Sequence, residues 1–173
     1  MNASPVRPTP AVKLAQQLKT VCAELKQRPL GLFDSEYGSG RFLLETQGVA
    51  CDLLFRLRPN RKVYGAPPPY AGKGRKATHG ALFRLSAPTI WPPPDEAWGV
   101  VDEKLGPLKI QRWDQQRFED APERPFTLLR VERVQARKTR RDPGVICLVG
   151  VWRRVPVTDA IRAVACVLEP LCD

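Results

Sequence analysis

A strand–helix–strand pattern near the N-terminus places the strongest constraint on how this chain folds. Residues 30–33 (LGLF) are a short apolar run, 41–48 (RFLLETQG) resemble a short helix closed by a glycine, and 51–58 (CDLLFRLR) form a second apolar run. A strand, a helix and a strand within about thirty residues predict a βαβ unit with two parallel strands. LGLF has no polar face, so we expect this strand to be buried on both sides.

One helix is expected before this unit, and an antiparallel β region after it. Apolar residues at three- and four-residue spacing over 11–27 predict an amphipathic helix that Pro29 ends. A further helix is predicted within 151–173. Between these segments, Gly, Pro and charged turns separate the predicted strands, which are 81–86, 97–103, 108–114, 126–134 and 145–152.

The charge balance indicates an anionic partner. The chain has 173 residues, a net charge of +10 and a pI of about 9.8. A chain this basic most often binds nucleic acid, and an anionic membrane surface is the weaker alternative. No apolar stretch approaches the ~20 residues that span a bilayer, and the N-terminus lacks the apolar core of a signal peptide.

The cysteines argue against a disulfide framework and against a zinc site. The chain has five, an odd number, and no two have CxxC spacing. Reduced thiols in a cytoplasmic protein fit this pattern best.

The positive charge is concentrated in one long segment. From Leu53 to Pro94 the chain has no Asp or Glu. Tyr64 and Tyr70 are interleaved in this segment, where unpaired bases can stack on them, and His79 is nearby. Basic side chains neutralise phosphates and release counterions, so the segment predicts contact with nucleic acid. Its basic residues are Arg56, Arg58, Arg61, Lys62, Lys73, Arg75, Lys76 and Arg84.

Other observations bear on this reading. Gly72 and Gly74 would let the backbone approach a phosphate closely, and a second basic cluster lies at 136–142. The alternative is a solvated loop with the prolines of 67–69 as a stiff spacer. His79 is the only histidine and no nucleophile motif accompanies it, so a structural or phosphate-contacting role is favoured over catalysis.

Asp34 is the candidate chemical group. It directly follows the apolar run 30–33, and an acid at the carboxyl tip of a strand is a common place for a metal ligand or catalytic acid. A two-metal site needs several carboxylates converging on ions roughly 4 Å apart. Glu36 follows a turn and Asp52 starts the next strand, at the end opposite to Asp34, so the residues alone do not assemble such a site. As a lone carboxylate, Asp34 is equally typical of a cap or turn residue.

These residues resemble a family. Five segments carry the resemblance: DSEYG, LLFRLRPNRKVYGAPPPYAGKGRKATHGALFRL, PTIWPPPDE, LKIQRWD and RPFTLLRVERV. These segments are similar to DDE-type transposases of bacterial insertion sequences. The similar enzymes have an RNase H-like catalytic domain interrupted by a large β-rich insertion. The resemblance extends from about Gln17 to Gly150.

The resemblance implies a fold class and roles for particular residues. The fold would be α/β plus β: a partial RNase H-like βαβ core over 11–58 and a β-rich antiparallel insertion over 59–150 that contacts DNA. Residues 1–10 would be a disordered leader, and 151–173 a divergent C-terminal helix. Asp34 would be one of three acids that hold two Mg²⁺ ions for cutting and joining DNA during transposition. The DNA-contacting residues would be Arg56, Arg58, Arg61, Lys62, Tyr70, Lys73, Arg75, Lys76 and His79.

The chain departs from the family at both ends, and these departures determine which function we expect. The family's first aspartate and its glutamate helix have no counterpart, and residues 151–173 hold a single Glu169 before Pro170. We therefore expect a truncated or degenerate DDE transposase, inactive alone, with a frameshift or early stop near residue 150 as one origin. One alternative is a module that binds element ends, full-length transposase or itself and represses transposition. The other is an unusual nuclease that uses Asp34, Glu36 and Asp52.

Overall fold

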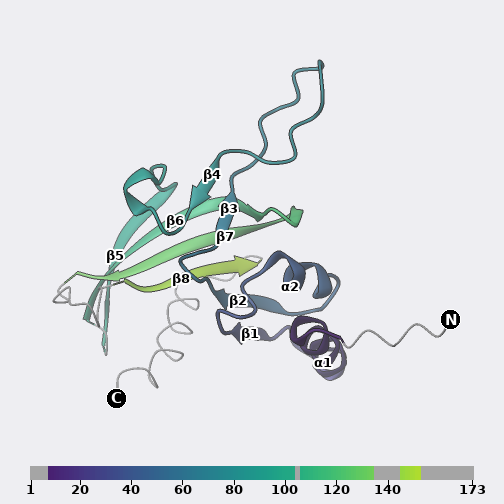
Figure 1. The fold of residues 1–173 in the computed structure, drawn as a ribbon. Coiled ribbons are helices and arrows are strands. Elements are labelled where there is room, and N and C mark those ends of the chain that lie inside the picture. Colours follow the sequence, from purple (N-terminus) through teal and green to yellow (C-terminus); the bar gives the residue numbers. More distant parts are fainter. Residues whose placement is uncertain (1–7, 104–105, 135–144, 153–173) are drawn as a thin grey trace.

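A computed structural model describes residues 8–103, 106–134 and 145–152, and Figure 1 shows the arrangement. Residues 1–7 of the predicted leader (1–10), the basic cluster 136–142 and the C-terminal helix beyond 152 lie outside the described residues, and Pro10, the last residue of that leader, begins α1. The elements, in chain order, are α1 (Pro10–Glu24), β1 (Leu30–Phe33), α2 (Gly40–Glu45), β2 (Asp52–Arg56), β3 (Lys62–Tyr64), β4 (Leu82–Arg84), the 3-10 turn η1 (Pro88–Ile90), β5 (Glu96–Asp102), β6 (Gly106–Phe118), β7 (Ala121–Arg133) and β8 (Val145–Trp152).

The described strands form one sheet in the order β1-β2-β8-β7-β6-β3-β4, with β5 paired to β6 outside this path. The pair β1–β2 is parallel, which confirms the predicted βαβ unit, and the other pairs are antiparallel. Because β8 pairs with both β2 and β7, the βαβ segment and the antiparallel segment share a continuous sheet. This mixed architecture is the expected fold class, α/β plus β with a partial RNase H-like core.

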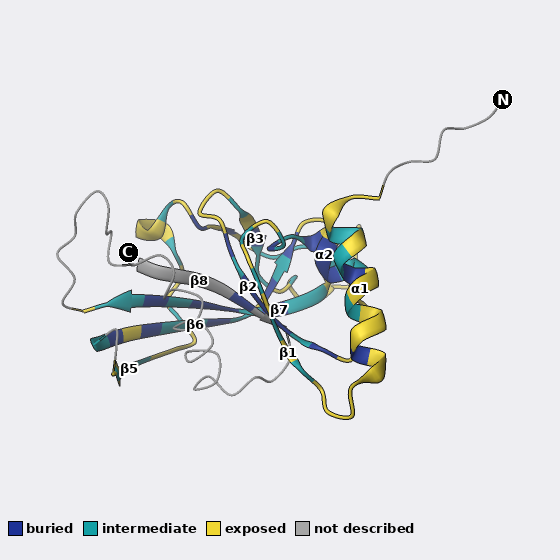
Figure 2. Cartoon of the chain, turned by 90° about the horizontal axis from the view of Figure 1, so that it is seen from below, coloured by how far each residue is buried: buried dark blue, intermediate teal, exposed yellow. Residues whose placement is uncertain are grey.

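The two helices cover the β1–β2 end of the sheet (Figure 2). Helix α2 has only six residues, too short to be stable by itself, so burial of Phe42 and Leu43 must hold it in place. Ser39 caps its first turn by accepting a hydrogen bond from the Phe42 N–H. The core continues from these residues into the antiparallel strands, where it includes Phe55, Val63, Phe83, Trp113, Phe118, Phe126 and Leu128.

The expectation that LGLF is buried on both sides is wrong. Strand β1 is an edge of the sheet, and Leu30 and Leu32 are exposed. Phe33, on the opposite face, packs on Phe42 with ring centroids 4.9 Å apart. This short apolar run is therefore an edge strand, although it has no polar face. An apolar run alone does not predict which strands flank it in the sheet.

Strands β6 and β7 extend further than predicted, to the turn that joins them. The register between them shifts at Gln115, whose φ is +58°, and again before Phe118. Such a bulge inserts an extra residue and breaks the alternation by which a strand is recognised in sequence. The start of β7 was not predicted because it contains Pro122 and Pro125, and proline is typical of turns.

Two buried thiols allow a prediction about reactivity and pH. Cys22 and Cys51 are free cysteines, and burial, together with the neighbouring Cys22, raises the pKa of Cys51 to about 11. At pH 8 we expect iodoacetamide to modify Cys51 more than about a hundred-fold more slowly than an unfolded peptide thiol with a pKa near 8.5. Because the pKa of Cys51 is higher in the folded chain than in the unfolded chain, the protonated thiol contributes to the stability of the fold below about pH 8.5. This contribution is lost as the pH rises toward 11. Mass spectrometry after timed alkylation measures the rate, and rapid modification of Cys51 in the folded chain would contradict this prediction.

No helix in the described part of the chain has both the length and the apolar character needed to cross a membrane.

Candidate nucleic-acid interface and the Asp34 carboxylate

Asp34 lies in a turn at the carboxyl end of β1. Its carboxylate accepts a hydrogen bond from the Ser35 N–H, and its carbonyl oxygen accepts one from the Tyr37 N–H at 3.0 Å. The side chain is exposed. Within the structure Asp34 is thus a turn residue with a solvent-facing carboxylate, as the more conservative sequence reading allowed.

Two arginines surround this carboxylate with positive charge. The Ser35 hydrogen bonds hold the pKa of Asp34 below its ordinary value, and the charges of Arg56 and Arg58 lower it further. Arg58 also donates to the Ser35 hydroxyl at 3.5 Å and lies 3.7 Å from the Glu36 carboxylate. Asp34 is therefore ionised at neutral pH, and two candidate DNA-binding arginines lie beside it.

Asp52, the acid at the start of the neighbouring strand, does not lie beside Asp34. Asp52 is in register with Leu30, at the opposite end of β1, and its carboxylate is 2.6 Å from Arg28 Nε. Leu30 and Asp34 are four residue steps apart along the strand, or about 13 Å. Among the described residues no group of three His, Cys, Asp or Glu side chains is placed to hold a metal ion. The donor set described here does not fit a two-Mg²⁺ site, and the nuclease reading that joins Asp34, Glu36 and Asp52 loses its geometric basis.

Gly38 fixes the turn that carries Asp34 against strand β2. It is buried, and a Cβ atom at this position would overlap the backbone carbonyl oxygen of Arg56. That oxygen cannot move without shifting β2. The glycine therefore sets the distance between the Asp34 turn and the arginines at the end of β2.

We expect Gly38→Ala to destabilise the protein by about 1–3 kcal/mol, the usual cost of forcing a methyl group into a packed site. Urea unfolding of the two proteins measures the difference. Gly99→Ala is the matched control, because its Cβ would meet only the Leu108 carbonyl at an ordinary 3.7 Å. Equal unfolding midpoints for Gly38→Ala and the parent chain would contradict the close approach.

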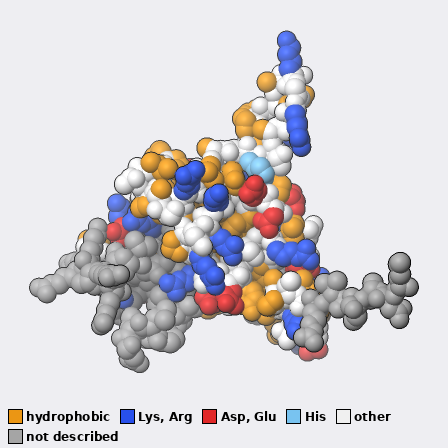
Figure 3. Space-filling model, in the orientation of Figure 1, with side chains coloured by type: hydrophobic (Ala, Val, Ile, Leu, Met, Phe, Trp, Pro, Cys, Tyr) orange, Lys and Arg blue, Asp and Glu red, His pale blue; other side chains and the backbone are white. Residues whose placement is uncertain are grey.

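A long arm, residues 65–81, projects from the sheet between β3 and β4 (Figure 1). Its base is closed by two backbone hydrogen bonds, from Gly65 N–H to the Ala81 carbonyl and from Gly80 N–H to the Gly65 carbonyl, at 3.0 and 3.1 Å. Lys and Arg side chains lie at the tip and along one side of the arm (Figure 3). The predicted contact residues Tyr70, Lys73, Arg75 and Lys76 all lie on it and are exposed.

The glycines of the arm have two different functions. Gly72 and Gly74 have φ of +79° and +77° with open space around them, so they turn the backbone at the tip. Tyr70 stabilises this tip by donating from its hydroxyl to the Gly74 carbonyl at 3.0 Å. Gly80, in contrast, lies where the two sides of the arm meet, and a Cβ there would overlap the Ala66 carbonyl.

His79 lies at the base of the arm and not at its tip. Its ring packs on Tyr64, with centroids 4.8 Å apart, and its Nδ1 atom is buried without a hydrogen-bond partner. This stacking gives His79 a structural contact. Its predicted contact with DNA stays a prediction.

A pair of like charges on β3 and β4 was not found from the sequence. Lys62 and Arg84 are directly opposite each other in this antiparallel pair, and both are exposed. Like charges in this position repel, and a bound phosphate would relieve the repulsion. The sequence places Arg84 in the basic segment but does not predict its pairing with Lys62. This pairing depends on the β3–β4 register, which is set across a seventeen-residue connection.

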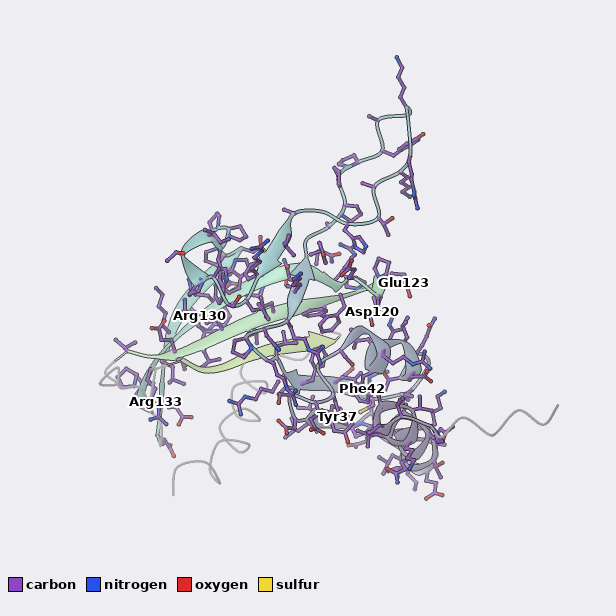
Figure 4. The ribbon with its side chains drawn as sticks, in the orientation of Figure 1. Tyr37, Phe42, Asp120, Glu123, Arg130 and Arg133 are labelled. Carbon is purple, nitrogen blue, oxygen red and sulfur yellow. The ribbon has the colours of Figure 1, made fainter. Side chains whose placement is uncertain are left out.

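Acidic residues lie close to the base of the arm in space, although they are distant in sequence. Tyr64, which precedes the arm, pairs with Arg117 near the end of β6, and Asp120 and Glu123 lie at the tip of the β6–β7 hairpin (Figure 4). The Asp120 carboxylate packs on Gly40 at the start of α2. The part of the arm that is free of acidic neighbours is therefore its distal part, around Lys73 to Lys76.

Comparison with known proteins identifies the family. Residues 4–118 match the model of the family described as DDE superfamily endonuclease. The match includes the βαβ unit, Asp34, the arm and the strands up to the end of β6. Neither the curated proteins nor the solved structures that were searched gave a match. Because the family model covers about two thirds of the chain, the chain belongs to the DDE superfamily endonucleases.

Proposed function

We propose that this chain binds DNA through the arm and the Lys62–Arg84 pair, and that it does not cut DNA alone. The observation that carries the proposal is the exposed distal arm, where Lys73, Arg75 and Lys76 have no acidic neighbour in sequence. Membership of an endonuclease family makes DNA the expected anion. The arm is long enough to follow a backbone or enter a groove while the sheet stays outside.

The absence of cutting follows from the donor set. Enzymes of this superfamily use divalent metal ions, and a two-ion site requires several converging carboxylates. Asp34 is one exposed carboxylate, the described residues contain no group of three His, Cys, Asp or Glu side chains that could hold a metal ion, and Glu36 lies near Arg58. We therefore propose a transposase-like protein that has a DNA surface for insertion-sequence ends and whose described residues form no complete Mg²⁺ site. A cytoplasmic location is part of the proposal, supported by the free thiols of Cys22 and Cys51.

A repressor function is the second candidate, and one observation favours it. Within the described part of the chain β1 pairs only with β2, so its outer edge offers unpaired backbone groups to another chain. A protein that binds element ends without cutting and also associates with a transposase would block transposition.

Photocrosslinking tests whether the arm meets DNA. Benzoyl-phenylalanine placed at Ala77, next to Lys76, keeps every arm charge and should crosslink to a bound duplex on irradiation. The control position is Gln16, exposed on α1 at the other end of the molecule. Crosslinks from position 77 and none from 16 are expected. Bound DNA that crosslinks from position 16 alone would place the interface elsewhere and overturn the proposal.

A further inference from the structure

Two free thiols lie together where α1 meets the sheet. Cys22 is in the last turn of α1, and Cys51 directly precedes β2, 29 positions later in the chain. Both side chains are buried, at 6% and 2% exposed, and both belong to the same core cluster. The Cys22 thiol lies within hydrogen-bonding reach of Cys51. The fold therefore brings together two sulfur atoms that are distant in sequence.

The position of Cys51 is fixed by its neighbours. Arg28 donates to the Cys51 carbonyl at 2.8 Å, and the Cys51 N–H donates to the Val49 carbonyl at 2.9 Å. Gly31 of β1 leaves the space that the sulfur occupies, since a Cβ atom at this position would lie 3.1 Å from Cys51 Sγ. The Gly31 N–H also donates to this sulfur. Strand β1 and the start of β2 thus hold the Cys51 thiol beside Cys22.

Helix α1 is attached to the rest of the molecule by little buried surface. Of its fifteen residues only Ala15 and Cys22 are buried. Its other contacts with the core come from Ala11, Leu14 and Leu18, which are partly buried. An element with so few buried side chains opens locally at a lower free energy than the whole domain. Such an opening exposes both thiols to a dissolved oxidant.

We propose that Cys22 and Cys51 form a disulfide when the chain meets a small-molecule disulfide such as glutathione disulfide, and that this bond fastens α1 to the sheet. One cysteine thiolate attacks a sulfur of the oxidant, so a mixed disulfide forms and one glutathione thiolate leaves. The other cysteine thiolate then attacks the protein sulfur of the mixed disulfide and displaces the second glutathione. The two cysteines together lose two electrons and two protons, and one glutathione disulfide becomes two glutathione thiols.

Proximity favours the protein disulfide over the mixed one, because the second thiol is already beside the first. Excess reduced thiol reverses both steps, so the bond is a response to oxidation and not a permanent part of the fold. The closed loop has about thirty residues and includes β1, the Asp34 turn and α2. A loop of this size should raise the melting temperature by roughly 5–10 °C, chiefly by constraining the unfolded chain.

Peptide mapping tests the pairing in the full chain. The reduced protein is equilibrated without oxygen in glutathione buffers of rising oxidised fraction, quenched with acid, alkylated and digested with trypsin. Cys22 lies in the tryptic peptide 20–26 and Cys51 in 42–56, so their bond gives a linked peptide that no other pairing gives. We expect this linked peptide to be the main disulfide product and to disappear with dithiothreitol. The control is the same equilibration in concentrated urea, where the five cysteines should form mixed pairings.

Two physical measurements follow on the oxidised chain. Its melting temperature should rise by roughly 5–10 °C, and hydrogen exchange of the α1 amides should slow at least about ten-fold. Cys22→Ala in the same buffer should show neither change. Because no DNA is present, the outcome is independent of the proposed DNA binding.

The proposal is overturned if both thiols stay free at the most oxidising ratio, or if the folded chain gives the same mixture of pairings as the chain in urea. A linked peptide in a chain whose melting temperature is unchanged or lower would also overturn it, because the bond would then not fasten α1 to the folded sheet.

Discussion

Alanine at Lys73, Arg75 and Lys76 is expected to flatten the salt dependence of DNA binding. Each phosphate contact contributes about 0.9 to the slope of log affinity against log salt, so three lost contacts reduce the slope by about 2.7. Between about 50 and about 200 mM salt, the parent chain should then lose roughly forty-fold more affinity than the variant. Fluorescence anisotropy of a labelled duplex at several salt concentrations measures both slopes.

The matched control for the arm removes three positive charges elsewhere. Lys13 and Lys19 on α1 and Arg41 on α2 are exposed and lie off the arm, on the two helices that cover the β1–β2 end of the sheet. Their replacement by alanine changes the net charge equally, so it isolates position from overall charge. If the arm variant and this control have the same slope, the arm does not contact phosphates.

Alanine at Phe42 is expected to cost about 3–5 kcal/mol of stability, the range for truncating a buried aromatic side chain. Phe42 is fully buried, and its ring lies 4.9 Å from Phe33 and 5.4 Å from Tyr37 between their centroids. The change therefore opens a cavity where α2, β1 and the Asp34 turn meet. Such a loss is a large part of the total stability of a domain this size.

Urea unfolding at 25 °C measures this cost. Arg41→Ala is the control on the same helix, since its ion pair with Glu45, at 2.6 Å, is exposed and contributes less than about 0.5 kcal/mol. A loss below about 1 kcal/mol for Phe42→Ala would show that the short helix does not depend on this side chain.

The sequence predicted the elements better than their environments. The βαβ unit follows from two apolar runs and the helix between them, and the β1–β2 register confirms it. Burial of β1 could not be predicted, because exposure of Leu30 and Leu32 depends on which strands flank them in the completed sheet. The ends of β6 and β7 were missed because the bulge at Gln115 breaks their alternation.

The candidate site was predicted in part. The basic segment indicated a nucleic-acid surface, and the structure gathers its distal residues on one exposed arm. Two contacts could not be predicted from the sequence: Lys62 pairs with Arg84, and His79 packs on Tyr64. Both depend on how the two ends of the arm pair, and no local sequence pattern predicts this pairing. For Asp34, the sequence placed Asp52 at the far end of the strand pair, and the register agrees.

The central claim is that this chain binds DNA without cutting it, and one assay measures both. The purified chain is incubated with an end-labelled duplex in Mg²⁺ or in EDTA, at low and high salt, and bound and cut species are resolved on native and denaturing gels. We predict salt-sensitive binding and no cut product in either condition. Mg²⁺-dependent cleavage that disappears in Asp34→Asn would contradict the account, because the missing acids would then lie within these 173 residues.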